Sequence, residues 1–168
     1  MGFKKTSDLV AISFRADEAA ANTFVQEEIA LQLDVLNNEI FVVIGVDLDP
    51  ANPDAIAATD TATTASVSAT TLTAVTGLAN SNVIATARDS IRAAGFADGG
   101  VAFTRAAEST IPAKADYIAL IATNNFFVQC QGVGNVATKD VQGRMWGYRA
   151  KADASTYAAL VQSEVLSA

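Results

Sequence analysis

The chain has 168 residues, a net charge of −7 at pH 7, no histidine and a single cysteine, Cys130. One cysteine allows no internal disulfide, and without histidine there is no Cys/His zinc set and no histidine base for a cysteine nucleophile. Because 51% of the residues are hydrophobic and only 17% are charged, we expect a building block rather than an enzyme, and the acidic balance disfavours nucleic acid as a direct partner.

The first half of the chain begins with residues 1–22, which lack the pattern of a signal peptide and are expected to form an N-terminal segment. Alternating apolar and polar residues predict a half-buried strand over Thr23–Val35. A run that is apolar on both faces predicts a central strand over Glu39–Leu48. Since Leu36-Asn37-Asn38 has the composition of a turn, the two strands are expected to pair as a long antiparallel hairpin.

The middle of the chain is rich in small and polar residues. Two prolines and three acidic residues predict a loop over Asp49–Thr63, and the Thr/Ala-rich stretch Thr64–Thr76 predicts an extended strand. Asn80–Gly95 fits either a short helix or a strand followed by a turn, and the sequence leaves both open. A short strand follows over Val101–Arg105.

The last third predicts strands over Asp116–Ala122, Phe126–Gln131 and Val141–Lys151. Asp153 is placed to cap a helix over about Ala154–Leu166. The expected apolar stripe of this helix is Tyr157, Leu160, Val161 and Val165. With seven or eight strands and no βαβ rhythm, we expect one domain over residues 1–168. It would be a mainly-β antiparallel sandwich of jelly-roll type whose C-terminal helix (153–168) docks on the domain or on a neighbour.

Two local motifs suggest ligand sites, and each has a simpler explanation. Gly132-Val133-Gly134-Asn135 resembles part of a dinucleotide fingerprint, but no helix is predicted after it, so a β-turn is expected. Carboxylates crowd into the stretch from Asp47 to Asp60 and make a weak candidate calcium loop, although its spacing is not that of an EF-hand. The candidate ligands are Asp47, Asp49 and Asp54, with Asn52 and Asp60 nearby. We therefore expect a solvated acidic loop, no bound metal and no cofactor.

A basic and aromatic strand near the C-terminus is the strongest candidate for molecular contact. Trp, Tyr and Arg are enriched at protein interfaces, and here they recur at the period of a strand. We expect this strand and the helix after it to contact neighbouring subunits. The predicted contact residues are Arg144, Trp146, Tyr148, Arg149, Tyr157 and Leu160.

The strand pattern also carries a resemblance. Two long strands, an acidic Pro-containing loop, a Thr-rich strand and three closing strands resemble a single jelly-roll coat protein of an icosahedral virus. The segment Asn124–Glu164, NNFFVQCQGVGNVATKDVQGRMWGYRAKADASTYAALVQSE, resembles the ends of structural proteins from phage and archaeal-virus genomes. The chain departs from the coat-protein pattern in having no long basic N-terminal arm, with only Lys4, Lys5 and Arg15 near its start.

The resemblance implies a capsid subunit located in the virion. Its partners would be copies of itself and other virion proteins, and its inner surface would meet a membrane or another protein layer rather than the genome. Two alternatives stay open. One is a decoration or cement protein on a phage head, and the other is a carbohydrate-binding β-sandwich that uses Trp146 and Tyr148 as a platform and the acidic loop for calcium.

Overall fold

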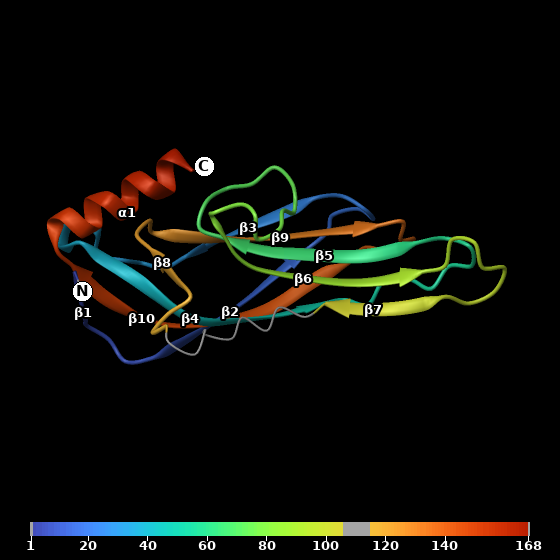
Figure 1. The fold of residues 1–168 in the computed structure, drawn as a ribbon, viewed down its shortest axis with the longest axis horizontal. Helices are drawn as coiled ribbons and strands as arrows, with labels where there is room; N and C mark the ends of the chain where they lie inside the picture. The colour runs from blue at the N-terminus through green and yellow to red at the C-terminus, as the bar shows by residue number, and fades with distance from the viewer. Residues whose placement is uncertain (1, 106–114, 168) are drawn as a thin grey trace.

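Two antiparallel sheets of five strands each form a sandwich with one helix at its C-terminal end (Figure 1). The structure is a computed structural model that describes residues 2–105 and 115–167, and these elements all lie within that part. The first sheet contains β1 (Phe3–Lys5), β2 (Val10–Asp17), β4 (Glu39–Pro50), β8 (Ala119–Ile121) and β10 (Asp140–Ala152). The second contains β3 (Val25–Ala30), β5 (Thr61–Ser68), β6 (Val83–Arg92), β7 (Val101–Arg105) and β9 (Asn125–Val133). The remaining elements are η1 (Val35–Asn37) and α1 (Ala154–Leu166).

The strand order identifies the sandwich as a jelly roll. It runs β2-β10-β4-β8 in the first sheet and β3-β9-β5-β6 in the second, so successive strands mostly alternate between the sheets, as two interlocked Greek keys require. Outside these eight strands, β1 continues the edge of β2 along β10, and β7 extends the second sheet beyond β6. The predicted mainly-β sandwich of jelly-roll type with a short C-terminal helix is confirmed.

The predicted hairpin between the third and fourth strands is wrong. β3 pairs with β9, whereas β4 pairs with β10 and β8 in the other sheet. The predicted strand ends early because Gln32 adopts a left-handed conformation, with φ of 53°. Leu31 and Leu33 on either side of it are buried in the core. The chain therefore crosses from one sheet to the other after Ala30, although the apolar and polar alternation of the sequence continues to Val35.

Several other segments differ from their predicted bounds. The Thr/Ala-rich strand stops at Ser68, and the open choice over Asn80–Gly95 is settled in favour of a strand, β6. The expected strand over Asp116–Ala122 shortens to the three residues of β8. The first 22 residues, expected only as a segment, contain β1 and β2.

The main core lies between the two sheets. Phe14 of β2 and Phe126 of β9 meet edge to face with their ring centroids 5.7 Å apart. Phe41 and Met145 from the first sheet pack into the same cluster. Cys130 lies in this core, and burial raises the pKa of its thiol to about 12. A buried thiol with a raised pKa behaves as a small hydrophobic side chain.

A second, smaller core lies on the outer face of the first sheet, beneath α1 (Figure 1). The helix begins at Asp153, whose carboxylate accepts a hydrogen bond from the Thr156 N–H at 2.7 Å, as the sequence predicts. Glu164 is buried and accepts hydrogen bonds from the backbone N–H groups of Ala122 and Thr123, which ties the helix to the end of β8. Val165, which the predicted stripe placed against the core, is 62% exposed. Among the described residues, the structure contains no helix long and apolar enough to span a membrane.

Gly147, like Gly143 on the same strand, is a position where the packing of the main core leaves no room for a side chain. A Cβ there would lie 2.5 Å from Cε1 of Phe41 and would press on the backbone oxygen of Val42. We predict that Gly147→Ala lowers the free energy of unfolding by about 1–3 kcal/mol, because backbone atoms must move to accept the methyl group. Urea denaturation measures the change. Gly77→Ala is the matched control, since nothing lies within 4 Å of its added Cβ. Equal effects of the two substitutions would contradict this packing.

Candidate functional site

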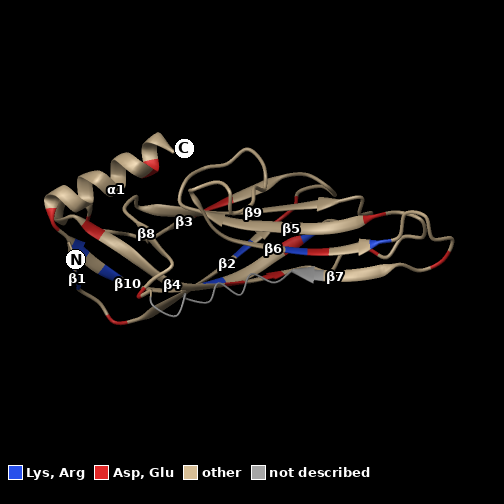
Figure 2. Ribbon diagram, in the orientation of Figure 1, with Lys and Arg blue, Asp and Glu red and all other residues tan. Residues whose placement is uncertain are grey.

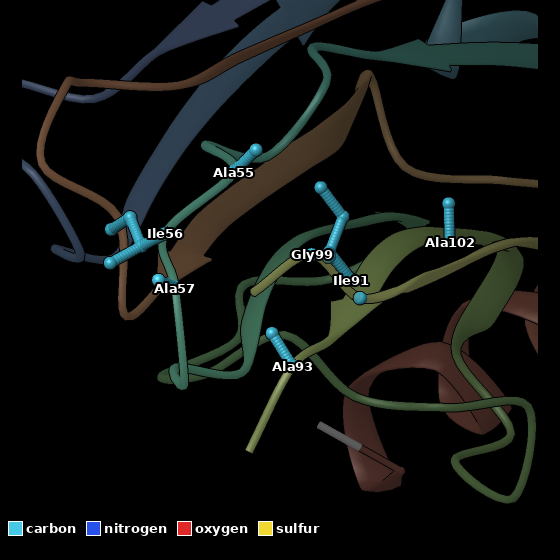
Figure 3. A pocket seen from close by; sticks show the side chains of 8 residues that line it. Ala55, Ile56, Ala57, Ile91, Ala93, Gly99 and Ala102 are labelled. Carbon is cyan, nitrogen blue, oxygen red and sulfur yellow. The ribbon is translucent and has the colours of Figure 1, made fainter. Parts of the chain in front are cut away.

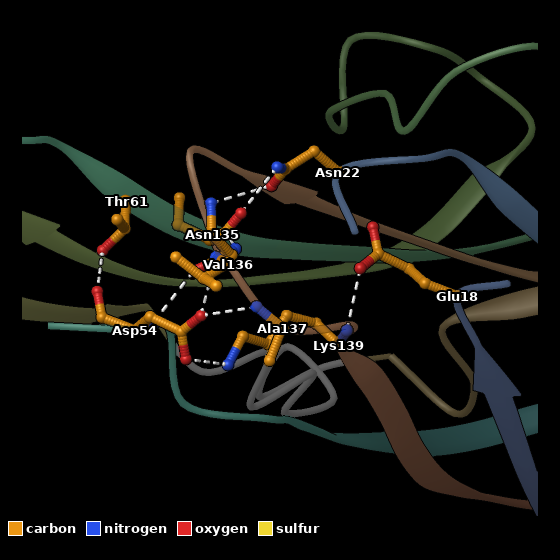
Figure 4. A network of polar contacts seen from close by, with 9 residues as sticks. Glu18, Asn22, Asp54, Thr61, Asn135, Val136, Ala137 and Lys139 are labelled. Carbon is orange, nitrogen blue, oxygen red and sulfur yellow. Dashed lines mark hydrogen bonds and ion pairs between the residues drawn. The ribbon is translucent and has the colours of Figure 1, made fainter. Parts of the chain in front are cut away.

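A network of polar contacts joins three loops at one end of the sandwich (Figure 4). The buried Glu18, just after β2, accepts hydrogen bonds from the backbone N–H groups of Gly132 and Lys139. Asp54, in the loop between β4 and β5, accepts from Val136 and Ala137 N–H. The two carboxylates thereby pair backbone donors at the end of β9 and in the turn between β9 and β10, which would otherwise lack a partner.

Asn135 is at the centre of the same network. Its side chain accepts from the Asp54 N–H and donates to the Ala62 carbonyl, and its own N–H donates to the side chain of Asn22. Gly134 before it has a φ of 67°, a conformation that favours glycine. The glycine motif is therefore a turn locked by side chains, in which the Gly132 N–H donates to Glu18 and the Asn135 N–H donates to Asn22.

The carboxylates of the weak calcium candidate do not converge. Asp47 and Asp49 lie exposed on β4, whereas Asp54 forms an ion pair with Lys139 at 2.6 Å. Asp60 accepts hydrogen bonds from Ala93 and Ala94 N–H beyond the end of β6. Among the residues that the structure describes, no group of three or more potential ligands lies close enough to hold a metal ion. The candidate calcium loop is thus not assembled, because its members serve different parts of the fold.

Four of the six predicted contact residues have a role within the chain itself. Tyr148 of β10 packs in the second core with Tyr157 and Leu160 of α1. Arg149 extends to the carbonyl of Leu31, to which its Nη2 donates a hydrogen bond at 2.9 Å. These residues hold the helix and the crossover after β3 in place. A role for them between subunits stays a prediction.

Arg144 and Trp146 lie earlier in β10, on the outer face of the first sheet and outside the second core. The guanidinium of Arg144 lies over the Trp146 ring, 5.9 Å from its centroid. A hollow of about 330 Å³ adjoins them, lined also by Ser13, Asp47 and Gln142. Charged residues of both signs occur on β2, β4 and β10 around it (Figure 2).

The sequence did not reveal an apolar hollow of about 290 Å³ at the β6–β7 end of the sandwich (Figure 3). Ile56 of the β4–β5 loop, Ile91 of β6 and Ala102 of β7 line it. Close by in the chain, Phe96 is 50% exposed, Val101 48% and Phe103 56%. No motif could have predicted this surface, because its residues are ordinary apolar ones from separate segments. It therefore becomes visible only once the sheets are assembled.

Comparison of the sequence with protein-family models and with curated proteins gives no match. Among solved structures, the chain is similar to one from Desmodium yellow mottle tymovirus, with 11% sequence identity over 88% of this chain and 91% of that one. The TM-score is 0.27. A similarity this low carries no argument about the role of this chain.

Asp54 gives the loop network a predictable response to acid. Hydrogen bonds from the Ala137 N–H and from Lys139 stabilise the carboxylate and lower its pKa from 3.8 to about 2. Because the pKa is depressed in the folded state, the stabilisation is present above about pH 4 and is lost as the pH falls towards about 2.

We therefore predict that Asp54→Asn lowers the thermal midpoint at pH 7 and flattens its decline between about pH 4 and pH 2. Thermal unfolding followed by circular dichroism at several pH values measures both effects. Asp98→Asn removes an equal charge from an exposed loop and is the matched control. A decline for Asp54→Asn as steep as that of the parent protein would contradict the assignment.

Proposed function

We propose that this protein is a structural subunit that self-assembles into the shell of a virion. The shell role rests on analogy at the level of the fold, since jelly rolls build viral capsids but also lectin and cupin domains. Support for self-assembly comes from one particular observation, the open apolar surface at the β6–β7 end.

This surface is apolar on both faces of an edge strand. Ala102 lines the hollow together with Ile91, its register partner on β6. Val101 and Phe103 alternate with Ala102, so they point to the opposite face of the sheet, and both are about half exposed. Within the described residues, β7 pairs with β6 alone. Exposed apolar groups along a free strand edge are a site for association with another chain.

A second copy of the chain is the proposed occupant. Closed shells are built from repeated contacts between identical subunits, and an edge strand with an adjacent hollow offers both backbone pairing and a place for an apolar side chain. Other virion proteins would bind to the assembled shell. A decoration or cement protein is the runner-up, and it would stay small on its own and bind only to a preformed head.

The double variant Val101→Lys/Phe103→Lys tests this contact. We predict that it converts a large, concentration-dependent species into a small one, because two added charges would have to be desolvated at the contact. Both side chains are partly exposed in the single chain, so its thermal midpoint should change little. Size-exclusion chromatography with light scattering measures the mass.

Leu36→Lys is the matched control, since Leu36 is 92% exposed in η1, outside this surface. It should leave the assembly unchanged. The proposal fails if the parent protein is a monomer at high concentration, and the contact is wrong if the double variant assembles like the parent.

A further inference from the structure

Trp146 lies on the outer face of the first sheet, where the two neighbouring strands carry only small residues beside it. Its register partners are Ala11 on β2 and Gly45 on β4. Neither partner has a side chain beyond Cβ, so neighbouring strands do not cover the indole ring. The guanidinium of Arg144, from the same strand, lies over the ring, 5.9 Å from its centroid. The ring is half-buried and lies outside the cluster beneath α1. A large aromatic surface is thereby presented at the sheet face.

Polar side chains occupy the next two positions along the same face. Arg144 lies between Ser13 and Asp47, and Gln142 lies between Arg15 and Asp49. Residues two apart on a strand are separated by about 6.6 Å, and neighbouring strands by about 4.8 Å. Donors and acceptors therefore form a regular array that starts beside the aromatic ring and extends away from it.

Two of these polar side chains make no hydrogen bond or ion pair with the described part of the chain. Within residues 2–105 and 115–167, the side-chain carboxylates of Asp47 and Asp49 have no hydrogen-bond or ion-pair partner. Arg144 lies directly opposite Asp47 in the register, yet its Nε donates to Ser13 Oγ at 3.3 Å. A ligand that donates to carboxylates and accepts from a guanidinium would find its partners already in place.

We propose that this hollow binds a neutral oligosaccharide of at least two pyranose rings. Its volume of about 330 Å³ is that of a small-molecule site. One sugar ring would stack on the indole surface of Trp146 that Arg144 leaves open, and the next would place its hydroxyl groups against Asp47 and Asp49 through charge-assisted hydrogen bonds.

The local charge selects against an anionic sugar. Two carboxylates line the site, while the nearby Arg15 is already paired with Asp17 at 2.7 Å and with Asp140 at 3.3 Å. Arg144 alone would have to balance an added negative charge. The inference does not rest on the proposed assembly, because the assembly surface lies on the second sheet.

The experiment uses the only tryptophan of the chain, Trp146, as its own reporter. The probes are cellobiose, lactose, maltose and N,N′-diacetylchitobiose, each titrated while tryptophan emission is recorded. We expect a saturable change with at least one of them, with a millimolar dissociation constant, and none with sialyllactose. The double variant Asp47→Asn/Asp49→Asn should weaken binding at least tenfold, whereas Asp98→Asn should leave it unchanged.

Three results would overturn the inference. They are the absence of a saturable change with all four disaccharides, equal affinity in the double variant and the parent, and saturation by sialyllactose. The particle mass of the Trp146→Ala variant, measured by light scattering, shows whether this residue also takes part in assembly. An unchanged particle mass is expected, and loss of assembly would make the face a subunit contact instead.

Discussion

The pairing of β10 with β4 in the middle of the first sheet is the constraint on which the rest of the molecule depends. The two strands match along almost their whole length, from Val141 opposite Pro50 to Lys151 opposite Glu39. Because side chains alternate along a strand, β10 divides its residues between two surfaces. Val141 and Met145 enter the core between the sheets, whereas Gln142, Arg144 and Trp146 lie on the outer face. Both ends of the chain are then fixed on β10, through β1 and β2 on its edge and through α1, which follows it directly.

Local pattern was enough to find many of the elements and not enough to pair them. The apolar run of β4, the alternation of β10 and the cap at Asp153 are properties of contiguous residues, and the sequence located them closely. Pairing in a jelly roll is a property of distant residues, so the crossover after β3 could not be read from the alternation that continues past it. The left-handed conformation of Gln32 could not be predicted from its residue type, because glycine and asparagine are the residues that commonly adopt it.

The candidate sites show the same difference between what neighbouring residues predict and what the fold brings together. Residue type and the period of a strand indicate the basic and aromatic residues of β10, but the fold uses Tyr148 and Arg149 internally and leaves Arg144 and Trp146 at the surface. The acidic residues from Asp47 to Asp60 resemble a ligand set because they are close in sequence. In space they are drawn apart, since Asp54 is held by the turn between β9 and β10. No sequence motif predicts the apolar hollow at the β6–β7 end.

A rigid sandwich with its loops locked at one end and a helix fixed at the other suits a subunit that must keep its shape while its edges and faces meet neighbours. The proposed self-contact lies on the second sheet and the proposed ligand site on the first, so one surface can stay open while the other is buried. Electron microscopy of the purified protein at high concentration tests the central claim of self-assembly most directly. Closed particles or regular arrays are the predicted result, and a field of dispersed single molecules would contradict it.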